Sequence, residues 1–279
     1  MNKGRALQVL TALAGGTALA AAGGAHILWH SGRRRPSLAL LAGGAAAEAA
    51  LLSQALIPNF PAGGRPFHRG DRSSRTVALT FDDGPRPPFT EAILDELRRE
   101  AVTATFFVLG ENARRYPETL RRIEAEGHRV ANHGYSHDIL MWAGAREARE
   151  NVGRADSAIR EAGVIDPAPL FRAPHGWLSP PAFRAVTGMG YRVTGWTKGV
   201  WDTANPGVEV IVDRTREALA PGAILLLHDG WAGKAELDRS QTAAALPGII
   251  EAAREKGLGF VTVEQMMRQS GDGASGSPA

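Results

Sequence analysis

Short apolar runs alternate with amphipathic stretches along most of this chain, and this alternation constrains the fold most. The runs are rich in β-branched and aromatic residues, which is typical of strands, whereas the stretches repeat apolar residues at helical spacing. Strands separated by helices predict a parallel sheet. The expected strands are 76–81, 103–109, 128–131, 169–172, 191–196, 223–228 and 259–263, and the expected helices are 88–99, 117–126, 143–162, 179–188, 208–219 and 240–256.

Titratable side chains follow five of the expected strands. They are Asp82 and Asp83 after the first, His133 and His137 after the third, Arg172 at the end of the fourth, Asp202 after the fifth, and His228 and Asp229 at the end of the sixth. A closed barrel of parallel strands brings all carboxyl ends to one face, where such folds carry their active sites. An open sheet would spread them along a row, so we expect an α/β barrel.

The motif His133-Gly134-Tyr135-Ser136-His137 predicts a metal site. Two histidines four residues apart can present two imidazoles to one ion, and a carboxylate completes a three-ligand set with open positions for water. A metal in such a site lowers the pKa of bound water to roughly 7. Because Asp82 and Asp83 are adjacent at a strand end, we expect their side chains to diverge, so that one binds the metal and the other accepts a proton.

Two sequence motifs, TFDDGP at 80–85 and NHGYSH at 132–137, are highly specific for one protein family. With them the chain resembles the polysaccharide deacetylases that have a NodB homology domain, carbohydrate esterase family 4. The resemblance covers about residues 74–268 and includes five motifs in order. It implies a distorted (β/α)7 barrel and a hydrolase that removes acetyl groups from sugars with one divalent metal ion, most often Zn²⁺, with Co²⁺ or Mn²⁺ as alternatives.

The resemblance also implies roles for individual residues. Asp82 corresponds to the catalytic base, Arg172 to its partner, His228 to the general acid and Asp202 to the aspartate that tunes this histidine. The implied metal ligands are Asp83, His133 and His137, and the implied substrate-binding residues are His175, through its backbone N–H, Trp196 and Leu226. The family commonly has an aromatic residue where His175 stands, so this side chain departs from the pattern.

The N-terminal part differs from the rest in composition. Residues 1–75 carry nine Lys and Arg and two acidic residues, whereas residues 76–279 carry 23 basic and 27 acidic residues. Residues 6–29 have no formal charge and 38–57 have only Glu48, and each stretch exceeds or equals the about 20 residues that cross a bilayer. We expect membrane segments within 1–57, a linker at 58–75, a catalytic domain at 76–268 and a disordered tail at 269–279. The alternative for residues 1–22 is a cleaved signal peptide.

These features limit the partners. A mildly acidic body disfavours nucleic acid as a ligand, and the absence of cysteine excludes disulfides and thiolate metal sites. No GxSxG motif occurs, which disfavours a metal-independent serine esterase.

The expected substrate is an N-acetylated glycan, similar to peptidoglycan or chitin. We expect the protein at the cell membrane with its catalytic domain outside the cytoplasm, and the sequence leaves the oligomeric state open. A deacetylase or deformylase of a lipid-linked amino sugar, or a non-catalytic carbohydrate-binding protein, are the alternatives.

Overall fold

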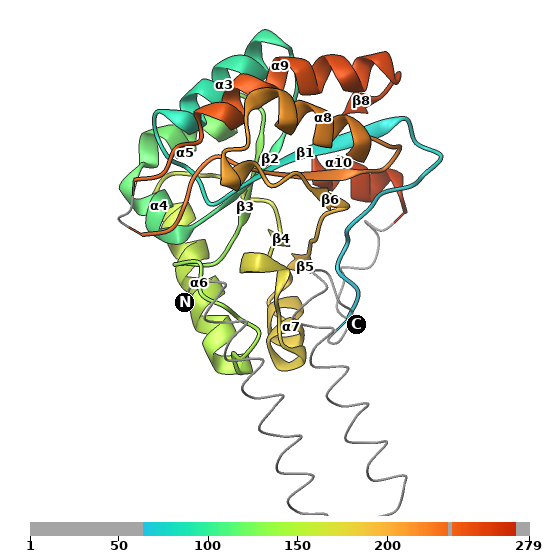
Figure 1. Cartoon of the computed structure of the whole chain (residues 1–279). Helices are drawn as coiled ribbons and strands as arrows, with labels where there is room; N and C mark the ends of the chain where they lie inside the picture. The colour runs from blue at the N-terminus through green and yellow to red at the C-terminus, as the bar shows by residue number, and fades with distance from the viewer. Residues whose placement is uncertain (1–63, 234–235, 272–279) are drawn as a thin grey trace, which may run out of the picture. The chain divides into compact units, whose positions relative to one another are not determined.

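Parallel strands joined by helices form the centre of the protein (Figure 1). The computed structural model describes residues 64–233 and 236–271, which belong to one compact unit. The eight strands in this part are β1 (Thr76–Asp82), β2 (Thr105–Val108), β3 (Arg129–Asn132), β4 (Leu170–Phe171), β5 (Arg192–Val193), β6 (Lys198–Gly199), β7 (Ile224–His228) and β8 (Gly259–Phe260). Their order is β5-β4-β3-β2-β1-β7-β6, and β8 pairs with the first residues of β1.

Helices follow most of these strands. They are α3 (Phe89–Arg99), α4 (Gly110–Arg115), α5 (Pro117–Ala125), α6 (Ala145–Glu161), α7 (Pro180–Thr187), α8 (Val208–Ala218), α9 (Ser240–Glu255) and α10 (Val263–Gln269). Two short 3-10 turns, η1 (Pro174–Gly176) and η2 (Asp202–Ala204), follow β4 and β6. The seven expected strands and six expected helices are confirmed, with bounds shifted by a few residues.

Three elements escaped the sequence analysis. β6 is a Lys-Gly pair without an apolar run, and α4 is only six residues long. The third is α10, which Thr262 starts through a reciprocal capping box with Gln265. This box satisfies two backbone donors at the helix start, and the expected last strand ends early because the helix begins there.

The expected membrane segments at 6–29 and 38–57 lie outside the described residues, as does most of the expected tail. They stay predictions. Within 64–233 and 236–271, none of the helices is long and apolar enough to span a bilayer.

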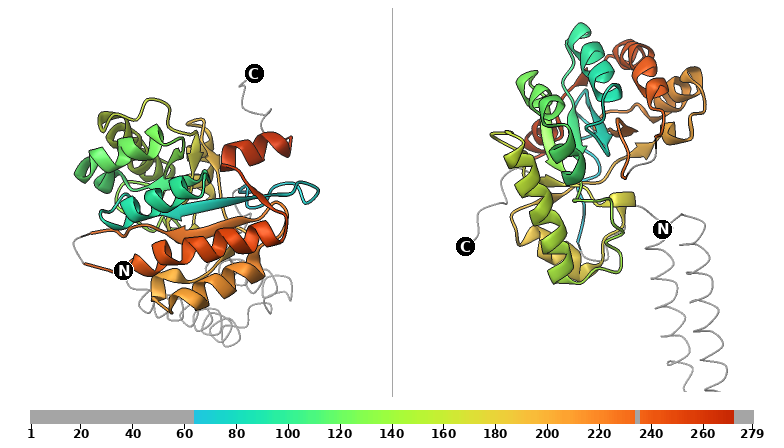
Figure 2. Two further views of the ribbon diagram at one scale, coloured as in Figure 1. Left: turned by 90° about the horizontal axis from the view of Figure 1, so that it is seen from above. Right: turned by 90° about the vertical axis from the view of Figure 1, so that its left-hand side faces the viewer.

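Alternation of side chains along the strands separates two layers of the core. On β1, Val77, Leu79 and Phe81 join the larger cluster, to which the helices α3, α8 and α9 contribute buried residues. These helices cover one side of β1 and β7 (Figures 1 and 2). Ala78, the next residue on β1, belongs instead to a smaller cluster. That cluster also contains Phe107, Ala131, Leu170 and Ile224 from β2, β3, β4 and β7, so it fills the inside of the curled sheet.

The sheet curls without closing, which corrects the expected seven-stranded barrel. Its edge strands β5 and β6 are two residues long and do not pair with each other among the described residues. Residues 66–70 cross the opening instead. The Phe67 N–H donates to the Val193 carbonyl at 2.9 Å, and the Gly70 N–H donates to the Gly222 carbonyl at 2.8 Å. This part of the expected linker is therefore hydrogen-bonded to the folded body.

The buried His128, just before β3, predicts a loss of stability in acid. Its side chain is 4% exposed, its Nδ1 accepts the Ala104 N–H at 3.2 Å, and its Nε2 has no hydrogen-bond partner in the described part of the chain. Burial lowers its pKa from 6.5 to about 4. Since the unfolded chain protonates first, His128 should cost about 3 kcal/mol of unfolding free energy between pH 7 and pH 4.

Urea unfolding of the wild type and His128→Gln at pH 7, 5.5 and 4 checks this. The variant should lose less stability over the range because glutamine does not titrate. Equal losses in both proteins would contradict the assignment.

Candidate active site

The turn after β1 sends two neighbouring carboxylates to different partners. Asp82 ends the strand, and Asp83 follows with a left-handed φ of 74°. Gly84 comes next, and a Cβ there would lie 1.9 Å from the Asp229 Oδ2 atom, so this position requires glycine. The Asp82 Oδ1 atom accepts from the Arg172 Nη1 at 2.7 Å, whereas the Asp83 Oδ1 atom faces the two histidines. The expected divergence of the two side chains is confirmed.

Asp83, His133 and His137 form a cluster suited to a metal ion. The Asp83 Oδ1 atom lies 3.3 Å from the His133 Nε2 and 3.2 Å from the His137 Nε2. The His133 Nδ1 donates to the Arg172 carbonyl at 2.8 Å, which leaves its Nε2 available as a ligand. Among the described residues, this is the one group of three such side chains whose ligand atoms lie within 4.8 Å of one another.

The electrostatics of this cluster also favour a cation. The Asp83 Oδ1 atom is buried and has no hydrogen-bond partner among the described residues, which is costly for a carboxylate oxygen unless a cation compensates it. Burial alone would raise the pKa of Asp83, but His137 and His133 lower it well below its ordinary value. Two imidazoles and an ionised carboxylate fit a divalent metal such as zinc.

Arg172 lies fully buried inside the curled sheet. Its Nη1 also donates to the Thr80 Oγ1 at 2.8 Å, and its Nη2 donates to the Gly195 carbonyl at 2.8 Å. Its Cζ atom lies 4.0 Å from the centre of the Phe107 ring. A buried charge requires such partners, and the Asp82 carboxylate supplies the opposite charge at 2.7 Å.

His228 faces Asp82 from the neighbouring strand, since the two residues are partners in the β1–β7 register. Its Nδ1 donates to the Asp202 Oδ1 at 2.9 Å, and its backbone N–H donates to the Asp202 Oδ2 at 2.7 Å. Thr242 on α9 donates to the same Oδ2 at 2.9 Å. Burial alone would lower the pKa of His228, but Asp202 raises it from 6.5 to about 9. The imidazole is therefore protonated at neutral pH, as a general acid requires.

The three expected substrate-binding residues lie beside these groups. His175 adopts a left-handed φ of 61°, and its ring centre lies 4.6 Å from that of His137 in an edge-on arrangement. Leu226 precedes His228 by two residues on the same face of β7 and is 8% exposed. A Cβ at Gly199 would lie 3.6 Å from Leu226 and 3.7 Å from the Trp196 Nε1, so both side chains lie next to Gly199. All ten expected site residues thus gather at one end of the sheet.

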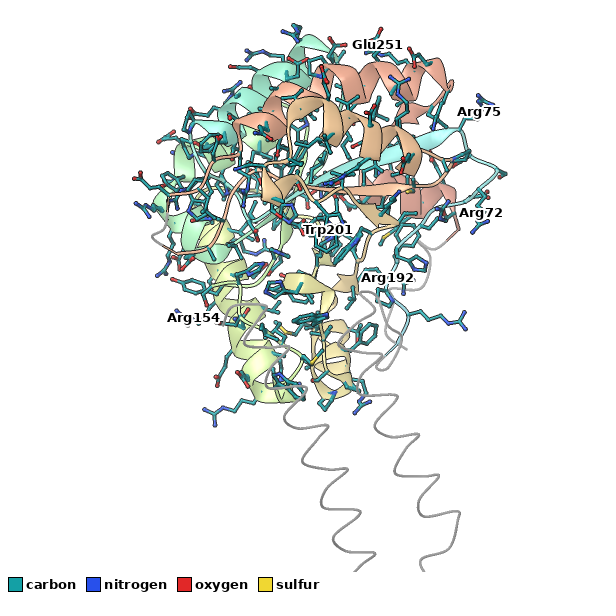
Figure 3. The ribbon with its side chains drawn as sticks, in the orientation of Figure 1. Arg72, Arg75, Arg154, Arg192, Trp201 and Glu251 are labelled. Carbon is teal, nitrogen blue, oxygen red and sulfur yellow. The ribbon has the colours of Figure 1, made fainter. Side chains whose placement is uncertain are left out.

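Sequence reasoning missed the residues that support these groups. Thr80 belongs to the TFDDGP motif and was a visible candidate, but Thr242 lies 40 residues from Asp202 without any spacing signal. Asn112 on α4 donates to the Asp83 carbonyl at 2.7 Å. Trp201, labelled in Figure 3, was not missed, because the sequence offers it either as a sugar-stacking residue or as a core tryptophan. It is 64% exposed beside Asp202, so it is not a core residue.

The contact between Asp202 and His228 predicts a shifted titration. In the metal-free protein, the pKa of His228 should be about 9, and Asp202→Asn should lower it because the amide keeps the shape without the charge. The raised pKa stabilises the fold below about pH 6.5, and this contribution is lost as the pH rises through about 9. An NMR titration of the His228 ring checks both proteins, and an unchanged pKa in Asp202→Asn would contradict the assignment.

Comparisons with known proteins agree with this geometry. Residues 69–194 match the family model described as polysaccharide deacetylase. A chitooligosaccharide deacetylase of Sinorhizobium fredii is 38% identical over 199 residues, which cover 70% of this chain and 93% of that protein.

Among solved structures, the Bc1960 peptidoglycan N-acetylglucosamine deacetylase gives a TM-score of 0.68 at 30% identity, covering 73% of this chain and 92% of that one. A mutant of BA3943, described as a family pseudoenzyme with restored enzymatic activity, gives a TM-score of 0.67 at 25% identity, covering 75% of this chain and 72% of that one. The resemblance expected from the motifs is thus confirmed, and the chain belongs to the polysaccharide deacetylase family, carbohydrate esterase family 4.

Proposed function

We propose that this protein is a metal-dependent hydrolase that removes N-acetyl groups from N-acetylglucosamine units of a glycan similar to peptidoglycan or chitin. The observation that carries the proposal is the convergence of three functional groups at one end of the sheet. Asp82 and His228 are register partners on adjacent strands, and the Asp83 cluster with its two histidines lies beside them. The names of the relatives, chitooligosaccharide deacetylase and peptidoglycan N-acetylglucosamine deacetylase, support the substrate class.

Asp83, His133 and His137 would hold one divalent metal ion. Zn²⁺ suits two imidazoles and a carboxylate best, and Co²⁺ or Mn²⁺ accept the same donors. When bound, the metal would polarise the acetyl carbonyl and make water acidic enough to ionise near neutral pH.

The remaining steps belong to side chains of this chain. Arg172 holds the Oδ1 atom of Asp82, which leaves Oδ2, 3.7 Å from the His133 Nε2, to accept the proton of the attacking water. Asp202 holds the Nδ1 of His228, which leaves Nε2 to donate a proton to the departing nitrogen. The water oxygen forms a bond to the acetyl carbon while the carbon–nitrogen bond breaks, so the products are acetate and a free amine on the sugar.

Two further groups complete the proposed site. The backbone N–H of His175 would donate to the oxyanion that develops on the acetyl oxygen. Trp196 and Leu226 would contact the acetyl methyl group, because they lie together around Gly199 on the inner side of the sheet.

A non-catalytic role is less well supported. Likeness to a pseudoenzyme shows that the fold alone does not decide activity. The decision rests on the residues, and here the base with its arginine, the three ligand candidates and the acid with its aspartate are all present and oriented toward their partners.

Release of acetate from N-acetylglucosamine oligomers tests the proposal. A chelator should abolish release by the full-length protein, and added Zn²⁺ should restore it. Asp82→Asn should lower kcat by about 10²–10⁴-fold, the usual contribution of a general base, and oligomer binding should persist. Release that survives the chelator, or Asp82→Asn with full activity, would contradict the mechanism.

A further inference from the structure

The opening between the edge strands β5 and β6 is crossed by residues 66–70, called the closing segment below. Its trace runs beside β5 and β6 in Figure 1, and Figure 3 labels Arg192 at the start of β5 and Arg72 just beyond the segment. Besides the two bonds given above, the His68 carbonyl accepts from the Thr197 Oγ1 at 2.8 Å, and Arg69 forms an antiparallel bridge with Ala223. The segment is thus bonded to both sides of the opening.

A short chain of hydrogen bonds connects this segment to the proposed catalytic base. The Gly195 N–H donates to the Phe67 carbonyl at 2.8 Å, and the Gly195 carbonyl accepts from the Arg172 Nη2 at 2.8 Å. The Arg172 Nη1 then donates to the Asp82 Oδ1 at 2.7 Å. One residue, Gly195, and one guanidinium therefore separate the closing segment from the carboxylate.

The orientation of Arg172 depends on few contacts. Its Nη1 bonds to Asp82 and Thr80, its Nη2 bonds to Gly195, and its Nε has no hydrogen-bond partner among the described residues. Among these hydrogen-bond partners, the Gly195 carbonyl is the one outside β1, and it therefore fixes the rotation of the guanidinium. Gly195 itself lies in the irregular connection between β5 and β6, where its N–H donates to the Phe67 carbonyl.

Packing adds a second connection. The Phe67 side chain is 5% exposed and belongs to the inner cluster with Phe107, Ala78 and Ile224, while Trp196 packs against the same cluster. The Phe107 ring lies against the Arg172 guanidinium. Phe67 therefore fills part of the apolar layer on which the arginine rests.

We propose that the closing segment is a positioning element for the deacetylation reaction. Through Phe67 and Gly195 it fixes the orientation of Arg172, and thereby the direction in which Asp82 presents its free oxygen. This inference rests on the proposed function, because it assigns the segment a role in the same reaction.

A double-mutant cycle in the full-length protein tests the inference. Phe67→Ala should lower kcat for acetate release roughly tenfold or more, since a shift of about 1 Å in a catalytic group can cost about 10²-fold. KM and zinc content should change less than about twofold, and Phe67→Leu should restore most of the rate. In an Arg172→Lys background, whose lysine lacks the second nitrogen of the fork, Phe67→Ala should have less than about a twofold effect.

Ile249→Ala is the matched control. Ile249 is likewise a buried apolar residue, but it belongs to the outer cluster on α9. Ile249→Ala should lower the melting temperature, as Phe67→Ala does, but it should leave kcat unchanged. The inference would be overturned if Phe67→Ala lowered kcat by the same factor in the wild-type and Arg172→Lys backgrounds. It would also be overturned if Phe67→Ala lowered the stability without lowering kcat.

An NMR measurement separates this inference from the proposed function. The Nη–H signals of Arg172 should be resolved in the wild type and in Ile249→Ala, and averaged by faster rotation in Phe67→Ala. Unchanged signals would overturn the positioning role. Absence of acetate release by the wild type would instead contradict the proposed function.

Discussion

The buried ion pair between Arg172 and Asp82 is the interaction on which the rest of the site depends. A guanidinium with no exposed surface is unfavourable inside a protein unless hydrogen bonds and an opposite charge compensate it. Thr80 and Asp82 on β1, Gly195 after β5 and the ring of Phe107 on β2 supply these partners. Only a sheet that curls around the arginine can bring them together. The curl in turn places Asp82, His228 and the histidine cluster at the same end.

This arrangement separates the tasks of two neighbouring aspartates. The left-handed backbone at Asp83 turns its side chain away from that of Asp82, so each carboxylate has its own environment. Arg172 donates to one oxygen of Asp82, whereas the Asp83 Oδ1 atom faces the imidazole nitrogens of His137 and His133 at 3.2 and 3.3 Å. On the neighbouring strand β7, the Asp202 carboxylate holds His228 and raises its pKa to about 9, which favours the protonated state that the proposed acid needs. The proposed base and the proposed metal ligand are both aspartates, so their different partners, Arg172 and the two histidines, distinguish them.

Sequence predicts the parts of this site that depend on local patterns. The apolar runs of β1, β2 and β7 and the TFDDGP and NHGYSH motifs are visible without a structure, and the ten expected residues do converge. The closing segment and β6 are not visible because neither has an apolar period of its own, and both are held by hydrogen bonds to residues distant in the sequence. Thr242 could not be predicted for a related reason, since packing of α9 alone brings it to Asp202. The expected closed barrel was wrong because the edge strands β5 and β6 do not pair with each other in the described part of the chain, and residues 66–70 cross the opening instead.

The most direct test of the division of labour between Asp82 and Asp83 is calorimetric titration of zinc into the metal-free protein and two isosteric variants. The wild type and Asp82→Asn should each bind one zinc ion with similar affinity, because Asp82 is held by Arg172 and is not a ligand. Asp83→Asn should bind at least about tenfold more weakly, since it removes the charged oxygen that faces both histidines. Equal loss of affinity in both variants, or full affinity in Asp83→Asn, would contradict this assignment of the two carboxylates.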